Sequence, residues 1–222
     1  DPSRTEPASR PALQPVPLSG PAAFVAGYPA QACQFFGLRS TGSAKADVEA
    51  FGTGVRPVEA FDAAFKQAIG FEAQIQFRQV SAAQCPAVDF LRDVPGNRTA
   101  SARFDLSAYS LKPGQAVDGT IQGAGLRAVT VLLVTDDGMV QPVPVRTQPD
   151  SGQTILTIPA DGGGTTNRRP KLVVVILSPE RPRALAQRGR MAAADLFPAL
   201  ARELAEDREG VTVLRQFFRV DG

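Results

Sequence analysis

The sequence predicts an α+β fold, in which a small β-β-α-β-α module precedes an antiparallel β-sandwich with one C-terminal helix. The chain has 222 residues, of which 43% are hydrophobic, so it can bury packed cores. Large apolar residues recur at helical spacing in 56–70, between short segments that alternate as strands do. From residue 100 onward, short apolar segments are separated by turn residues, which is typical of a sandwich or a rolled sheet.

Residues 1–23 are expected to be a proline-rich linker. Seven prolines occur by position 29, and proline neither donates to a β-ladder nor fits inside a helix. The alternative is that these prolines are a ligand for another domain. The sequence begins without Met and without an apolar signal core, so we expect the C-terminal part of a longer protein.

Residues 24–97 are expected to form the small module, with strands at 33–40, 43–52 and 73–81. A turn at Ser40-Thr41-Gly42 would pair the first two strands, with Ala46, Val48 and Ala50 buried and Asp47 and Glu49 exposed. The predicted helix 56–70 begins near Pro57, ends before Gly70 and carries a stripe of Val58, Phe61, Phe65 and Ile69. Ile75, Phe77 and Val80 would share one face of the third strand, and a second helix over 82–94 would pack Val88, Phe90 and Leu91 inward.

Residues 98–222 are expected to form the β-sandwich-like domain. Its strands are expected at 102–110, 115–123, 126–134, 139–147, 153–160, 171–178 and 211–220. The Thr135-Asp136-Asp137-Gly138 stretch predicts a hairpin turn, and the fully apolar segment 171–178 predicts a strand covered on both faces. A helix over 191–210 would be capped by Asp195, hold Pro198 in its first turn and present Leu196, Leu200 and Leu204 on one face.

Composition excludes several function classes. Lys and Arg total 24 against 22 Asp and Glu, which gives no basic face for nucleic acid. There is no histidine, so a Ser-His-Asp triad, a Cys-His pair and an imidazole metal site are excluded, and two cysteines do not make a four-thiolate site. No run of about 18 apolar residues is present to span a membrane. We therefore predict no catalytic residue, no metal and no cofactor.

The two cysteines, Cys33 and Cys85, bracket most of the predicted module. A disulfide between them would join the start of the first strand to the helix after the third, and would imply an oxidising compartment. The alternative is two separate buried thiols in a cytosolic protein, because a free cysteine packs well as a small apolar side chain. The pair lacks the C-x-x-C spacing of a redox-active site.

Two basic segments are candidate contacts for an anion or a partner. The Gly-rich segment 159–170 lacks the Lys of a Walker motif and precedes a strand, which favours a surface loop. The segment 181–190 carries four arginines, and a solvated connection is its ordinary interpretation. The candidate contact residues are Arg168, Arg169, Arg181 and Arg183.

Two long segments carry a resemblance. The stretch CQFFGLRS…VSAAQC at 33–85 resembles the small BON-like α/β modules of bacterial envelope proteins. The stretch YSLKPGQ…VPV at 109–145, with KLVVVILS after it, resembles an uncharacterised β-rich domain at the C-termini of membrane-anchored bacterial Ser/Thr protein kinases and of some caspase-like proteins. The resemblance implies an upstream kinase domain and membrane segment. It transfers no functional residue.

The expected function is therefore a non-catalytic, extracytoplasmic sensing or partner-binding region of a membrane-anchored bacterial signalling protein, such as a Ser/Thr kinase. Its expected partner is a protein or a cell-envelope ligand, and a segment upstream would tether it to the membrane. One alternative is a structural component of a cell-envelope or secretion assembly. Another is an envelope enzyme that uses carboxylates alone, such as a glycosidase, although no acidic pair marks a cleft. The sequence leaves the oligomeric state open.

Overall fold

A computed structural model describes residues 20–94, 101–160, 170–186, 189–205 and 210–221. Its helical elements are α1 (Pro21–Gly27), α2 (Arg56–Ile69), η1 (Ala82–Gln84), α3 (Cys85–Asp93), η2 (Arg183–Leu185) and α4 (Ala193–Leu204). Its strands up to the middle of the chain are β1 (Gln34–Gly42), β2 (Lys45–Gly52), β3 (Gln74–Gln79), β4 (Arg103–Leu106), β5 (Ser110–Leu111), β6 (Ala116–Gln122) and β7 (Ala128–Val134). The remaining strands are β8 (Met139–Pro142), β9 (Val145–Thr147), β10 (Thr154–Pro159), β11 (Lys171–Ser178), β12 (Met191–Ala192) and β13 (Thr212–Val220).

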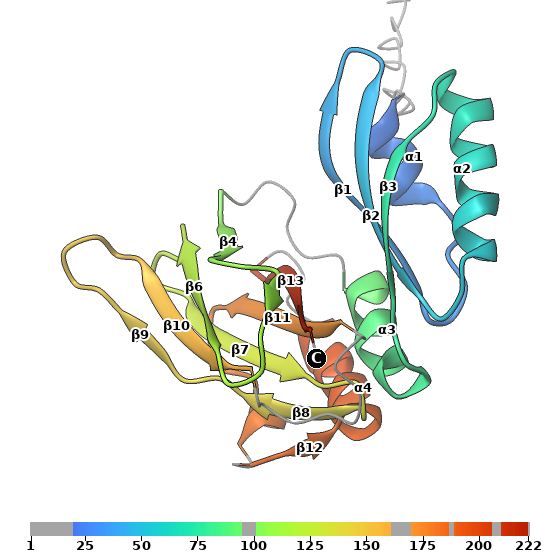
Figure 1. The fold of residues 1–222 in the computed structure, drawn as a ribbon. Coiled ribbons are helices and arrows are strands. Elements are labelled where there is room, and N and C mark those ends of the chain that lie inside the picture. Colours follow the sequence, from blue (N-terminus) through green and yellow to red (C-terminus); the bar gives the residue numbers. More distant parts are fainter. Residues whose placement is uncertain (1–19, 95–100, 161–169, 187–188, 206–209, 222) are drawn as a thin grey trace, which may run out of the picture.

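The predicted α+β class is confirmed: a small mixed sheet with helices precedes two larger sheets and a helix near the C-terminal end (Figure 1). The small sheet has the order β1-β2-β3, in which β2 pairs antiparallel to β1 and parallel to β3. We call α1, β1, β2, α2 and β3 the N-terminal unit. No helix of the described part is long and apolar enough to cross a membrane.

Helices α1 and α2 cover one face of the small sheet. Phe61 and Phe65 of α2 are fully buried there, with Val58 and Ile69 at the edges, as the helical stripe predicts. The helix ends at Gly70, whose φ of 92° suits glycine at this position. Helix α1 begins at Pro21, inside the segment expected to be linker, because proline is well suited to the first helical turn.

The hairpin between β1 and β2 turns later than predicted. Gly42 pairs with Lys45, so the turn residues are Ser43 and Ala44, and Ala44 has a φ of 54°. The expected turn at Ser40-Thr41-Gly42 is therefore wrong, because those residues extend β1. The register shifts between Leu38 and Ser40, and this bulge leaves Arg39 without a partner in β2.

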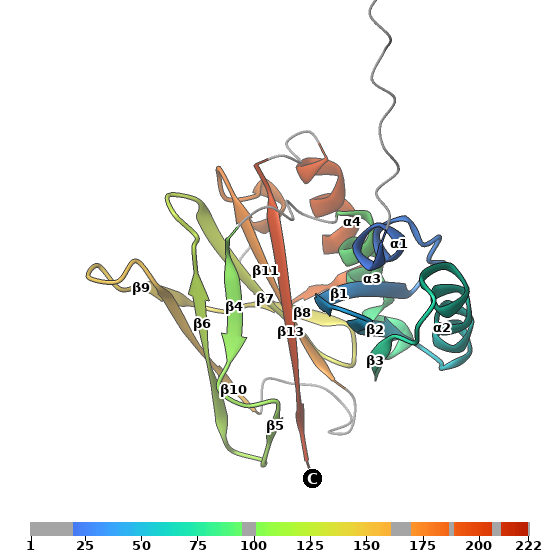
Figure 2. The same ribbon diagram turned by 90° about the horizontal axis from the view of Figure 1, so that it is seen from above.

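The second part of the chain, which we call the β-rich unit, contains residues 101–221 as far as they are described. Its sheets have the orders β4-β6-β10-β9 and β12-β8-β7-β11-β13-β5. Figure 2 shows β4, β6 and β9 on the side of β13 that faces away from the N-terminal unit. Strand β11 is buried along its whole length, as predicted. Alternate residues serve different cores: Val173, Val175 and Leu177 face the four-stranded sheet, whereas Leu172, Val174 and Ile176 face away from it.

A third layer covers that outer face of the six-stranded sheet. It consists of α3, α4 and side chains from the N-terminal unit, all in one apolar cluster with β11. Val88, Phe90 and Leu91 of α3 point inward as predicted, but into this shared cluster. Val80 also lies there, so it does not share the face of Ile75 and Phe77.

Helix α4 presents Leu196, Leu200 and Leu204 to the shared cluster, as predicted. Two details of its N-terminus differ from the prediction. Ala192 is the capping residue, so Asp195 lies in the first turn and makes no capping hydrogen bond. Pro198 lies inside the helix on its exposed side, where the missing N–H breaks one hydrogen bond of the helix.

Candidate functional site

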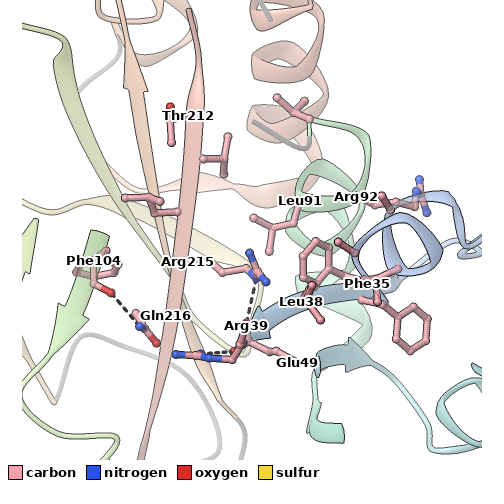
Figure 3. A pocket seen from close by; sticks show the side chains of 18 of the residues that line it. Phe35, Leu38, Arg39, Glu49, Leu91, Arg92, Phe104, Thr212, Arg215 and Gln216 are labelled. Carbon is pink, nitrogen blue, oxygen red and sulfur yellow. Dashed lines mark hydrogen bonds and ion pairs between the residues drawn. The ribbon is translucent and has the colours of Figure 1, made fainter. Parts of the chain in front are cut away.

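A groove of about 740 Å³ runs along the seam between the N-terminal unit and the β-rich unit (Figure 3). Helix α1 supplies an uncharged wall that includes Ala22, Val25 and Ala26. Strand β1 and the end of α3 continue that side, and β4 and β13 supply the other. The groove therefore brings together segments that are far apart in the sequence.

Runs of consecutive strand residues line this groove. They are 35–39 in β1, 102–105 at β4 and 212–216 in β13. Because side chains along a strand alternate between two faces, five successive residues reach one cavity only where the edge of the strand borders it. β1 and β4 are edge strands of their sheets, and β13 is paired on its second side only at Arg219 and Val220, with β5. Strand edges, with their backbone donors and acceptors, therefore border the groove.

A buried carboxylate lies at the floor of the groove. The side chain of Glu49, on β2, is 1% exposed and faces two arginines. Arg39 donates from Nη1 to Oε1 at 3.4 Å, and Arg215 of β13 places Nε 3.0 Å from Oε2. Figure 3 shows the two arginines converging on Glu49 from different strands. A buried carboxylate requires such compensation, because removing its charge from water is costly.

Gly37 makes room for this contact. A Cβ at Gly37 would lie 1.9 Å from Nη2 of Arg215, so a larger residue there would displace the guanidinium from its present position. The guanidinium carbon of Arg215 also lies 4.3 Å from the centre of the Phe35 ring. On the neighbouring strands, Arg78 lies 4.0 Å from the ring centre of Phe217 in the same manner. Cation–π stacking thus joins the two units in both directions.

Positive charge exceeds negative charge at this point of the seam. Glu49 stands against Arg39 and Arg215, with Arg78 nearby behind the groove lining. The other carboxylate near Arg39, Asp47, already pairs with Lys45 at 3.4 Å. Burial lowers the pKa of Arg78, Glu49 raises it, and the nearby guanidiniums of Arg219 and Arg39 lower it further. The Nε–H of Arg78 is buried with no hydrogen-bond acceptor in the described part of the chain. The site is therefore favourable for an additional anionic group.

The disulfide between Cys33 and Cys85 is present, with the two Cα atoms 4.7 Å apart. It joins the residue before β1 to the first residue of α3, as predicted. Asp89 of α3 supports the same junction, because its carboxylate accepts a 2.7 Å hydrogen bond from the backbone N–H of Cys33. Since α3 packs in the shared cluster, the bridge fastens the N-terminal unit to the layer that covers the β-rich unit.

Of the arginines expected as contacts, the two that are described, Arg181 and Arg183, do not line the groove. Arg181 and Arg183 are exposed near η2, where the backbone N–H of Arg183 donates to Glu203. Arg168 and Arg169, with the Gly-rich loop, lie outside the described residues.

The carboxylate of Asp137 stabilises the turn of the β7–β8 hairpin. Asp137 accepts hydrogen bonds from the Thr135 hydroxyl and the Met139 backbone N–H, and Arg190 lies 3.5 Å away. Gly138 has a φ of 77°, as the predicted hairpin requires.

Among the residues that the structure describes, no group of three His, Cys, Asp or Glu side chains is suited to a metal ion.

Sequence reasoning did not select Glu49, Arg39, Arg78 or Arg215. One signal was available. Phe51 lies on the same face of β2 as Glu49, and Phe217 lies on the same face of β13 as Arg215. An aromatic residue on the supposedly solvated face of a strand indicates that another element covers it.

Comparison with known proteins identifies no family. No family model matches the sequence, and no curated protein matches it. A crystal structure of a DUF4785 family protein from Legionella pneumophila subsp. pneumophila str. Philadelphia 1 is similar at 10% sequence identity with a TM-score of 0.35. The match covers 54% of this chain and 28% of that protein, so this chain corresponds to less than a third of its length.

Proposed function

We propose that this chain is a non-catalytic, extracytoplasmic binding region that holds a protein partner in the seam groove. One observation carries the proposal: unpaired strand edges from both units border a single groove of about 740 Å³. Free edges provide backbone hydrogen bonds to an incoming chain, and the apolar side chains around them provide burial.

The disulfide supports an extracytoplasmic setting, because such bridges persist in oxidising compartments. The setting we propose is a membrane-anchored bacterial signalling protein, such as a Ser/Thr kinase, in which the groove would sense a partner outside the cytoplasm. This setting rests on the resemblance of 33–85 and 109–145 described above. Sequencing of the parent gene tests it, and a parent protein without a membrane segment would contradict it.

The binding function is tested by selecting from a displayed library of random nine-residue peptides on the disulfide-intact protein. Ala26 is exposed on the α1 wall, so Ala26→Trp would fill the groove without disturbing a core. Ala63→Trp, at an exposed position of α2 outside the groove, is the matched control. We expect selected peptides to lose binding to Ala26→Trp alone. Equal binding to both variants, or no enrichment at all, would contradict the proposal.

A further inference from the structure

We propose that the partner is an extended acidic peptide segment, which adds as a strand to the free edge of β1 and sets a carboxylate against Arg39. This inference rests on the proposed groove binding and goes further, because it assigns the edge, the chemistry and the contact residue. Three observations carry it: the regularity of the β1 edge, the different chemistry of the two sides of the groove, and the excess of arginine at Glu49.

Strand β1 offers a pairing edge of defined length. It pairs with β2 on one side and with no described strand on the other. The pairing with β2 is regular from Gln34 to Leu38, and the bulge at Arg39 interrupts it. In a regular antiparallel strand, alternate residues direct their N–H and C=O groups away from the existing partner. The part of β1 in the groove, 35–39, therefore fits about five residues of an added strand.

The competing edges are less open. Gln216 of β13 donates from Nε2 to the backbone carbonyl of Phe104 at 2.9 Å, which links β13 directly to β4. Strand β5 already pairs with the far end of β13 at Arg219 and Val220. A strand that entered between β4 and β13 would have to break the Gln216 bond, whereas pairing with β1 breaks none of the described bonds.

The two sides of the groove differ in charge. The α1 wall and the residues that follow it have only small, aliphatic or aromatic lining residues: Ala22, Val25, Ala26, Tyr28 and Ala30. The charged lining residues lie on the strands and on α3. Because the side chains of an added strand alternate, one set would meet the apolar wall and the other set would meet the charged side. An apolar–acidic alternation suits this groove.

Arg39 is the best-placed residue to receive the acidic side chain. It belongs to the bulge that ends the regular edge, and its side chain is 36% exposed. It shares Glu49 with Arg215, and Arg78 adds a third positive charge nearby. Arg92, in contrast, is already paired with Asp89 and Asp93 of its own helix. A carboxylate on Arg39 would thus reduce the charge excess and accept a charge-assisted hydrogen bond.

The chemistry of the groove favours a peptide over a polyanion. Binding of a polyanion depends on several cationic side chains that follow its charges. Here the α1 wall lacks charged lining residues, and the groove lining has four arginines against Glu49 and Asp105. An acidic polysaccharide would leave its hydroxyl groups against alanine and valine, without hydrogen-bond partners.

The test uses the nine-residue peptide library described above. The enriched peptides should carry Asp or Glu at one fixed position among apolar residues. Binding of the best of them should fall about tenfold in Arg39→Gln and should be partly restored in Arg39→Lys. Arg146→Gln, at an exposed position of β9, is the matched control and should leave binding unchanged. The Tm of each variant shows whether the fold is retained when Arg39, a partner of the buried Glu49 carboxylate, is replaced.

Methylation of single backbone nitrogens in the best peptide tests the strand pairing. Methyl groups on alternate residues should each reduce binding more than tenfold, and those between them should have little effect, because only every second N–H would face β1. Uniform tolerance of the methyl groups would overturn strand addition.

Other results separate the two proposals. Enrichment of peptides without acidic bias, with loss in Ala26→Trp, would overturn this inference and leave groove binding intact. Dependence on Arg103, an exposed arginine on the β4 side, in place of Arg39 would overturn the assigned edge. Binding of polygalacturonate that requires Arg39, with no enriched peptide, would overturn both peptide proposals and identify an acidic glycan as the occupant. No enrichment and no polygalacturonate binding would overturn both proposals.

Discussion

Arg215 is expected to stabilise the seam through Glu49, and Arg215→Met tests this directly. Methionine keeps much of the length of the side chain and can still lie on the Phe35 ring, but it removes the guanidinium 3.0 Å from Glu49. Glu49, which is 1% exposed in the native protein, would keep Arg39 at 3.4 Å as its one ion-pair partner among the described residues. Removal of one partner from a buried ion pair costs about 3–5 kcal/mol.

Because Arg39 remains, the expected cost is at the lower end of that range, about 3 kcal/mol. For a chain of this length, such a loss corresponds to a decrease in Tm of about 6–12 °C. The assay is urea unfolding at pH 7 with the disulfide intact, followed by far-UV circular dichroism. The matched control is Arg219→Met on the same strand, because the Arg219 side chain is 60% exposed and pairs with Asp221 at the surface. Its expected cost is below about 1 kcal/mol.

The double variant Glu49→Gln/Arg215→Met separates charge from packing. Once the buried carboxylate is neutral, loss of Arg215 should cost about 1 kcal/mol, which gives a coupling energy of about 2 kcal/mol between the two residues. Equal free energies of unfolding for Arg215→Met and Arg219→Met would refute the reasoning. So would a coupling energy near zero, because Arg215 would then act through packing alone.

Three further predictions concern single features of the fold. Cys33→Ser/Cys85→Ser should lose about 4 kcal/mol by the chain-entropy estimate for a 52-residue separation, and the denatured, unreduced native protein should show no free thiol. Burial raises the pKa of Asp137, but the Thr135 hydroxyl, the Met139 N–H and Arg190 together bring it below its ordinary value of 3.8. The stabilisation by Asp137 is therefore complete above that ordinary value and is lost as the pH falls through the folded pKa, so Asp137→Asn should be destabilised relative to the native protein at neutral pH, and the difference should shrink as the pH falls below 3.8. Pro198→Ala restores a helical N–H on the exposed side of α4 and should raise the free energy of unfolding by about 1–2 kcal/mol.

Local patterns predicted the elements that depend on local chemistry. The stripe of α2, the β7–β8 turn at Gly138 and the doubly covered β11 follow from spacing, turn residues and continuous apolarity. The disulfide followed from the presence of just two cysteines in the chain. Each of these features depends on residues within one segment or, for the disulfide, on the fact that each cysteine has one possible partner in the chain.

Non-local packing explains what the sequence did not predict. Alternation in β2 correctly placed Ala46, Val48 and Ala50 on one face, but it placed Glu49 in solvent. The other face is buried because β13, more than 160 residues later in the chain, crosses it with Arg215 and Phe217. An alternating pattern tells the two faces of a strand apart, but it does not say which distant element covers the polar one.

The same limitation applies to the expected module of residues 24–97. The amphipathic pattern of α3 correctly predicted which of its residues are buried. They are buried, together with Val80, in the cluster that also contains residues of α4 and β11. Gln84 of η1 also donates from Nε2 to the carbonyl of Pro170 at 2.8 Å. The end of the expected module is therefore built into the packing of the β-rich unit.

This shared packing predicts that the two units unfold together. Phe35 and Phe51 lie in the shared cluster, and their burial contributes roughly 3–6 kcal/mol that a separated N-terminal unit would lose. A unit of about 60 residues has little stability of its own, so that loss would unfold it.

The chain provides probes for both units, because it has two tyrosines and no tryptophan. Tyr28 contacts Phe61 in the N-terminal unit, and Tyr109 contacts Phe217 of β13. Tyr109→Phe leaves a fluorophore in the first unit, and Tyr28→Phe leaves one in the second. Within each variant, the urea midpoint from tyrosine fluorescence should equal the midpoint from far-UV circular dichroism. A Tyr28 signal lost at lower urea than the dichroism would show that the N-terminal unit unfolds alone, and the seam would then be a contact between independent domains.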